Sequence, residues 1–182
     1  INSISLGDVS SGSLTVKAGE DVTVTGSKVQ AGQFEQNEEG MYVATGTPAN
    51  LTIDAVGNIK ITGGAQVGAS GTATVKAGDA VTVDGSDLAS IDALTVTGKN
   101  VKVEGGANVV SHANVTVTGT DAVTIDGSKI GSDAKTKISG ASVTAQNKAG
   151  IYGTTGVDID ATADATIDFV KSTAGDVSVT AG

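Results

Sequence analysis

A repeat of about 21 residues runs along the chain, and it limits the possible folds more than any other feature. Short triplets in which two apolar residues flank a polar one, such as Leu14-Thr15-Val16, recur at a nearly constant interval. The spacings between their last residues are 37, 22, 21, 21, 21, 21 and 20, so the first contains an extra insertion of 16 residues. The positions concerned are Val16, Ile53, Val75, Val96, Val117, Ile138, Ile159 and Val179.

Two further apolar series follow the first within each repeat. Apolar and polar residues alternate within each stretch, which indicates a half-buried strand. Gly, Asp, Asn and Ser separate the stretches, and these residues tolerate tight or left-handed turns. The second series is Val24, Ile61, Val83, Val103, Ile125, Ala145 and Ile167. The third series is Val29, Val67, Leu88, Val109, Ile130, Ile151 and Val170.

Strands this short, joined by corners of a few residues, predict an all-β fold of the parallel β-solenoid type. Each repeat forms one coil of three strands, and equivalent residues of successive coils stack about 4.8 Å apart. The whole chain, residues 1–182, is then a single solenoid segment of about eight coils, with an inserted loop at about residues 31–50. Such a rod is on the order of 35 to 40 Å long.

The composition fits a narrow core and argues against several functional classes. Val and Ile total 36 residues against 5 Leu, and branched side chains favour strands. The chain has no Cys, which excludes disulfides and thiolate metal sites. All 11 basic residues are Lys and the net charge is −9, so nucleic-acid binding is disfavoured. No apolar run approaches the roughly 20 residues of a membrane-spanning helix.

Three runs resemble the repeats of filamentous haemagglutinin-like exoproteins: AGEDVTVTGSKVQAG (residues 18–32), AGDAVTVDGSDL and TGTDAVTIDGSKI. This family comprises large bacterial adhesins and toxin-delivery stalks that are exported by two-partner secretion. The resemblance covers nearly the whole chain except the insertion, and it implies a right-handed β-helix in a surface fibre or stalk. The sequence lacks an Asn-Pro-Asn type of motif and a toxin domain, so the resemblance implies a piece of the repeat shaft.

Outward Thr residues should form columns along the solenoid. One column is predicted to contain Thr15, Thr52, Thr74, Thr95 and Thr116. Regular Thr arrays order water in ice-binding solenoids, so this function is one alternative. Interruptions of the Thr columns favour the other alternative, in which Thr is simply a residue well suited to strand surfaces. The interrupting residues are Lys60, Lys102, Lys137 and Asp158.

An acidic column follows the second strand of the coils and includes Asp84, Glu104 and Asp126. Stacked like charges repel, so such a column is a weak candidate for cation binding. The alternative is a solvated acidic corner whose charges are screened by salt and nearby Lys. We expect no metal site and no cofactor, because the calcium-roll nonapeptide is also absent.

The insertion holds the best candidates for contact with a partner, which are Phe34, Met41 and Tyr42. Long excursions from a solenoid commonly carry binding function. The alternative is that these large side chains pack against a side of the solenoid. His112 lies in the turn Ser111-His112-Ala113-Asn114 and is predicted to be a surface turn residue.

These features together predict a structural or adhesive shaft of a secreted or surface-displayed bacterial fibre, without catalytic chemistry. A self-assembling filament or a toxin-delivery stalk is the second hypothesis, and an ice-binding solenoid is the third. The chain has no initiator Met or signal peptide at Ile1, so we expect a processed product or a fragment. Expected partners are further repeats or a second copy end to end, and a cell-surface receptor or glycan.

Overall fold

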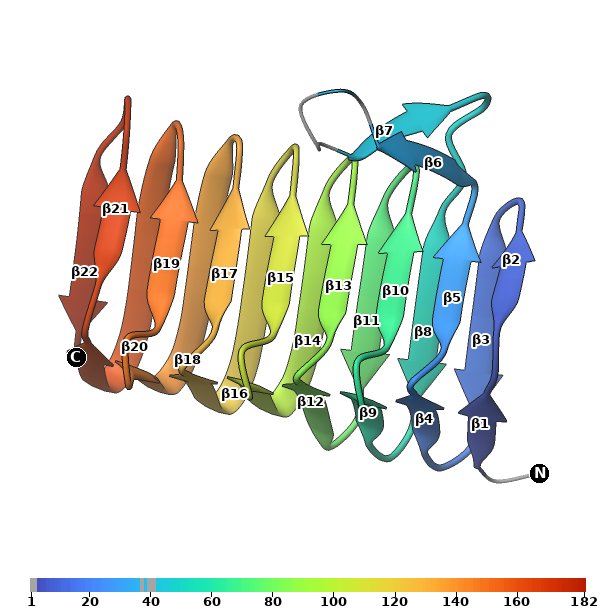
Figure 1. Cartoon of the computed structure of the whole chain (residues 1–182). Coiled ribbons are helices and arrows are strands. Elements are labelled where there is room, and N and C mark those ends of the chain that lie inside the picture. The colour runs from blue at the N-terminus through green and yellow to red at the C-terminus, as the bar shows by residue number, and fades with distance from the viewer. Residues whose placement is uncertain (1–2, 37, 39–41) are drawn as a thin grey trace.

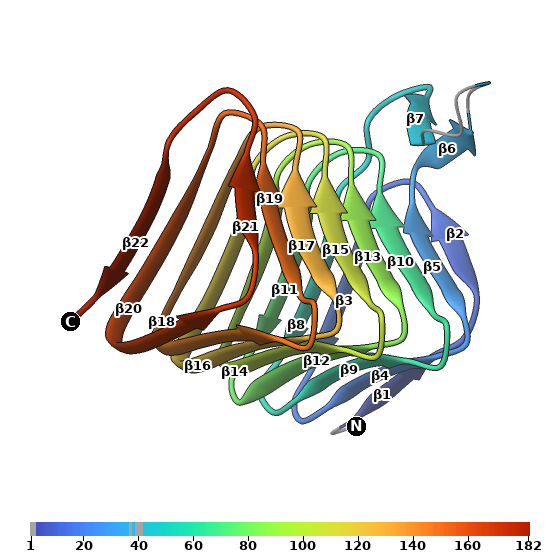
Figure 2. The ribbon, with the colours of Figure 1, turned by 60° about the vertical axis from the view of Figure 1, so that its left-hand side comes forward.

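The protein is a parallel β-solenoid that winds in a right-handed sense, as seen in a computed structural model (Figures 1 and 2). The structure describes residues 3–36, 38 and 42–182. No helix occurs among these residues. The all-β class, the repeat of about 21 residues and the stack of about eight coils predicted above are therefore confirmed.

Each coil has three sides, which we number in chain order. The second side is one sheet of eight parallel strands: β2 (Val9–Ser11), β5 (Lys28–Ala31), β10 (Gln66–Ala69), β13 (Asp87–Ser90), β15 (Asn108–Ser111), β17 (Lys129–Ser132), β19 (Gly150–Gly153) and β21 (Val170–Ser172). In the early coils the first side consists of β1 (Ile4–Leu6), β4 (Val22–Thr25), β9 (Ile59–Thr62) and β12 (Ala80–Asp84). The third side there consists of β3 (Leu14–Ala18), β8 (Leu51–Ala55) and β11 (Ala73–Ala77).

In the later coils the third side continues into the next first side as one bent strand. Irregularities in strand register at Gly98, Gly119 and Gly140 mark the bends. A Cβ atom on Gly119 would lie 2.1 Å from the carbonyl oxygen of Ala122, so this bend requires glycine. The bent strands are β14 (Leu94–Glu104), β16 (Val115–Asp126), β18 (Lys135–Gln146) and β20 (Gly156–Ile167), and the short β22 (Val177–Ala181) follows them.

The core consists of stacked ladders of small branched side chains. Val16, Ile53, Val75 and Val96 occupy one register column, and the two other predicted series form columns on the other two sides. Most of these side chains have almost no exposed surface. Stacked branched residues fill a narrow interior without aromatic side chains, which explains the scarcity of Phe, Tyr and Trp.

From the second coil to the seventh, the corner between the first and second sides alternates between two forms. Short corners have one residue with positive φ, such as Gly85 or Gly127, followed by Ser. Long corners have two such residues followed by Ala, as in Gly105-Gly106-Ala107. The Ser and Ala residues share one column, which runs Ser27, Ala65, Ser86, Ala107, Ser128, Ala149.

Short and long corners are joined by hydrogen bonds. The buried hydroxyl of Ser128 accepts from the backbone N–H of Ala107 (3.1 Å) and donates to the carbonyl of Asp126 (2.9 Å). Ser86 bonds the N–H of Ala65 (3.0 Å) in the same way. Equivalent corners such as Gly85 and Gly127 are 42 residues apart, so the structural repeat is two coils.

The insertion forms an antiparallel hairpin outside the solenoid, made of β6 (Gln33–Gln36) and β7 (Tyr42–Thr45). It leaves the coil after Ala31 and returns at Ala49, where the buried Ser70 hydroxyl of the next coil accepts the Ala49 N–H at 3.0 Å. Strands β5 and β8 keep their register with later coils on either side of it. The hairpin stands beside the second side of the solenoid (Figure 2).

Candidate functional site

The outer face of the third side is a regular polar array. Thr15, Thr52, Thr74, Thr95 and Thr116 stack in register, as predicted. The column then continues with Lys137 and Asp158. On the first side Lys60 and Lys102 alternate with Thr in the same manner. Neither column therefore presents Thr in every coil.

The outer face of the second side is different, because its central column is small or apolar. A solvent-facing column of a sheet ordinarily carries polar residues. Side chains between the two ends of this column expose apolar surface, and Val110 is 38% exposed. The column runs Ser10, Gln30, Gly68, Ala89, Val110, Gly131, Tyr152, Lys171.

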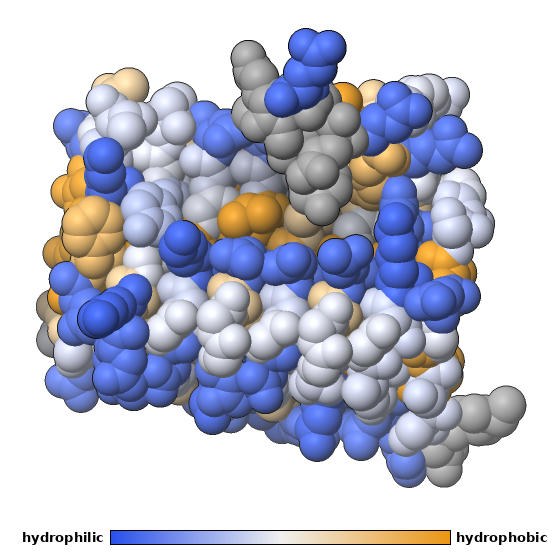
Figure 3. Space-filling model, viewed as in Figure 1, coloured by the Kyte–Doolittle hydropathy of each residue, from blue (hydrophilic) through white to orange (hydrophobic). Residues whose placement is uncertain are grey.

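A groove of about 360 Å³ lies on this face beside the hairpin. Gly68, Ala89 and Val110 form its floor, and Phe34 of β6 lies over one end. Figure 3 shows the hollow at the centre of this face, with an apolar patch at its base and a row of hydrophilic residues along one margin. The volume is within the range of pockets that bind small molecules.

The Phe34 ring lies above Gly68 of β10. A Cβ atom added to Gly68 would lie 3.7 Å from two atoms of the Phe34 ring, an ordinary contact distance. The absence of a side chain at Gly68 leaves space beneath the ring, and the neighbouring Gln30 is only 7% exposed. Phe34, which is half-buried, both anchors the hairpin and lines the groove.

Polar side chains border the groove on both long edges. Lys28, Gln66 and Asp87 line one edge, and the Asn108 amide donates to Asp87 at 2.8 Å. The opposite edge contains His112 and Asp133. These edges therefore offer both donors and acceptors, and part of this set is already held in place by hydrogen bonds.

His112 and Asp133 form a close pair across two coils. The distance between His112 Nδ1 and Asp133 Oδ2 is 2.5 Å, and both side chains are partly exposed. His112 does lie in a surface turn, as predicted. Its carboxylate partner was not predicted, although Asp133 is 21 residues away and thus one repeat later.

Tyr152 occupies the same face beyond the open part of the groove. Its ring would overlap a Cβ atom on Gly150, with a closest distance of 2.5 Å, and it also covers Gly131. The ring lies 5.7 Å from that of Phe169, which is 47% exposed. The exposed apolar surface of the second side is thus flanked by Phe34 near one end and by Tyr152 near the other.

The acidic column has partners within the solenoid. Glu104 pairs with Lys102 at 2.7 Å, and Asp126 accepts from the amides of Asn147 (2.7 Å) and Gln146 (3.2 Å). These two amide hydrogen bonds lower the pKa of Asp126. Asp84 lies beside Glu104 in register. Within the described part of the chain, no three His or carboxylate side chains come together as metal ligands would.

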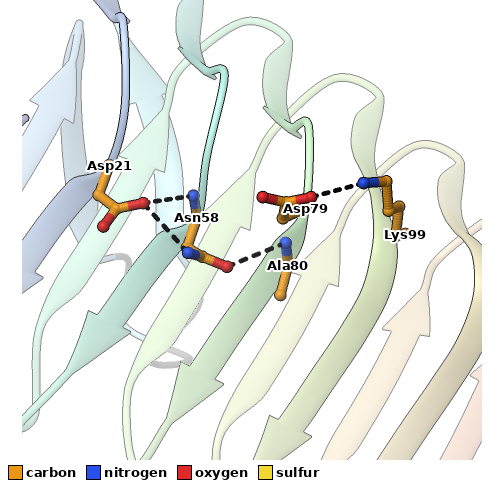
Figure 4. A network of polar contacts seen from close by, with 5 residues as sticks. All are labelled: Asp21, Asn58, Asp79, Ala80 and Lys99. Atoms are coloured by element: carbon orange, nitrogen blue, oxygen red, sulfur yellow. Dashed lines mark hydrogen bonds and ion pairs between the residues drawn. The ribbon is translucent and has the colours of Figure 1, made fainter. Parts of the chain in front are cut away.

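Carboxylates at another corner also bond neighbouring coils (Figure 4). Asp21 accepts from the backbone N–H of Asn58 (2.6 Å) and from its side-chain amide (3.1 Å), which lowers the pKa of Asp21. The side-chain oxygen Oδ1 of Asn58 accepts in turn from the N–H of Ala80 (3.3 Å). Asp79 accepts from Lys99 at 2.6 Å, and this raises the pKa of Lys99.

Of the three predicted contact residues, Phe34 alone can be placed by its side chain. Met41 lies outside the described residues, and for Tyr42 only the backbone, in β7, is described. Lys28, Asp87, Val110, His112 and Asp133 were not predicted as site residues. One sequence signal could have identified this face. Gly68, Ala89 and Val110 occupy outward strand positions, where the alternation of apolar and polar residues would place polar side chains.

Comparisons with models of protein families, with curated proteins and with solved structures gave no match. No helix in the described part of the chain is long and apolar enough to span a membrane.

Proposed function

We propose that this chain is a shaft segment of a secreted or surface-displayed bacterial fibre or adhesin, and that it performs no catalysis. The observation that supports this role best is the continuity of the ladder. All eight strands of the second side pair in parallel from β2 to β21. The hairpin leaves and rejoins the solenoid without shifting this register. A closely packed stack of this kind is stiff, because each coil is bonded to both neighbours.

The exposed residues of the last strand support a partner at that end. Val177 and Val179 belong to inward-facing columns, yet they are 43% and 48% exposed. A further coil, from more repeats or from a second copy, would bury them and pair with the edge of β22. A self-assembling filament is a second candidate, because a second copy could pair with this edge. A toxin-delivery stalk belongs to the same class, since it would need the same stiffness.

Immunolabelling of cells that carry the gene tests the proposal. We expect antibody against the solenoid to label the outside of intact cells, and electron micrographs to show the label along thin fibres. Label confined to the cytoplasm would contradict a surface role. Release of reducing sugar from cell-surface polysaccharides by the purified chain would contradict a non-catalytic role.

A further inference from the structure

The groove beside the hairpin combines apolar surfaces with polar edges in a particular arrangement. Ala89 and Val110 lie beneath it, and the Phe34 ring lies over one end. Lys28, Gln66 and Asp87 stand along one edge, with His112 and Asp133 along the other. A ligand that fits must therefore have apolar faces and hydrogen-bonding groups around its perimeter.

The charges of the groove disfavour an ionic ligand. Two carboxylates, Asp87 and Asp133, face one ammonium group, Lys28, and the imidazole of His112. Phosphate or carboxylate ligands would need an excess of cationic donors, and the chain as a whole carries a net charge of −9. A purely hydrocarbon ligand is also disfavoured, because it would bury these polar edges without replacing their hydrogen bonds to water.

The backbone of the floor disfavours an added peptide strand. Strands β10, β13 and β15 pair with each other along their whole lengths, so their N–H and C=O groups are used within the sheet. Binding by strand addition requires a free sheet edge. The ligand must instead bond to side chains.

We propose that this groove binds a neutral saccharide. Sugar rings have two faces formed by C–H groups and a perimeter of hydroxyls that both donate and accept hydrogen bonds, which matches the apolar base and the mixed polar edges. The Phe34 ring provides an aromatic surface for one ring face, and the carboxylates of Asp87 and Asp133 accept hydrogen bonds from hydroxyls at opposite edges. The proposal does not depend on the shaft role, because it concerns one face of the molecule.

Binding of the purified chain to a printed array of neutral and acidic oligosaccharides tests the proposal, followed by calorimetry with the neutral glycan that gives the strongest signal. Phe34→Ala removes the aromatic surface and should weaken binding at least tenfold. Ala89→Phe fills the floor and should abolish binding. Thr95→Phe is the matched control, because it places the same side chain outward on the third side, and it should bind as the unmodified chain does.

Circular dichroism and thermal unfolding of each variant separate loss of binding from loss of fold. Retained β-structure with lost binding in Ala89→Phe, together with normal binding in Thr95→Phe, supports the site. The proposal is overturned if no neutral glycan binds, if acidic glycans are preferred, or if binding survives both groove variants. Loss of binding in Thr95→Phe as well would also overturn it, since the effect would then not be specific to this face.

Discussion

The short and long corners of the solenoid occupy equivalent places in successive coils but differ in backbone conformation and in hydrogen bonding. A short corner turns with one left-handed glycine and places a Ser hydroxyl inside. A long corner has an extra residue, and the N–H of its Ala bonds a carbonyl of its own corner and also the Ser hydroxyl of the following short corner, as at Ala65 and Ala107. Neighbouring coils are therefore complementary rather than identical. Their alternation explains why the ladder is continuous while the corners differ in length.

Deleting coils in ones or twos gives the strongest test of this complementarity. Removing residues 88–129 takes out 42 residues and leaves Ser86 next to a long corner. Removing residues 109–129 takes out 21 residues, places two long corners side by side and deprives the Ala107 N–H of Ser128. We expect the variant that lacks 21 residues to have an unfolding free energy about 2 to 5 kcal/mol lower than that of the variant that lacks 42, although its chain is longer.

Chemical denaturation of the two deletion variants measures this difference. Stability in repeat arrays normally rises with the number of repeats, so an order reversed in this way would be specific to the corners. If the longer variant is the more stable one, the corners are interchangeable and their alternation does not contribute to the unfolding free energy.

Removing a single hydroxyl group tests the same hydrogen bond between corners with a smaller change to the protein. Ser128→Ala removes one of the two acceptors of the Ala107 N–H, which keeps the Glu104 carbonyl at 3.2 Å, and we expect a loss of about 0.5 to 1.5 kcal/mol in unfolding free energy. Ser27→Ala is the control, because the half-exposed Ser27 hydroxyl donates to Thr25 within its own corner. Urea titration of both variants distinguishes them, and equal losses would show that the bond between corners contributes nothing.

The smallest effect concerns the one long corner without glycine in its left-handed positions, at Asn147 (φ 57°) and Lys148 (φ 66°). Asn147 donates to Asp126, so the pKa of Asp126 is lowered on folding and its contribution to stability is present above the ordinary value of 3.8. This contribution is lost as the pH falls through the folded-state pKa. Asn147→Gly keeps the left-handed turn but removes the donor, so the pKa should rise toward 3.8.

A carboxyl NMR titration of Asp126 measures that shift directly. Lys148→Gly changes the adjacent left-handed residue without removing the amide and should leave the pKa of Asp126 unchanged. An unaltered pKa in Asn147→Gly would mean that Gln146, the other amide partner, is sufficient to hold the carboxylate.

The sequence predicted the solenoid well because its strongest signal, the spacing of Val and Ile, is the signal that fixes the core. The spacing from the second apolar series to the third alternates between five residues (Val83 to Leu88) and six (Val103 to Val109). This difference is small beside the 21-residue period, so the alternation of Ser86, Ala107 and Ser128 was not predicted. The groove was missed for a related reason. Gly68 and Ala89 look like weak strand residues when read singly, and only the stacking of coils shows that they share a column with Val110.

The pairing of short with long corners also has a genetic consequence. Tandem repeats gain and lose copies when recombination joins one repeat to a later one out of register. An exchange offset by 42 codons would join matching corners, whereas one offset by 21 codons would join mismatched corners. Alleles of this gene should therefore differ in length by multiples of two coils, that is, of 42 codons. Selection for protein stability would then be visible in the lengths of the alleles.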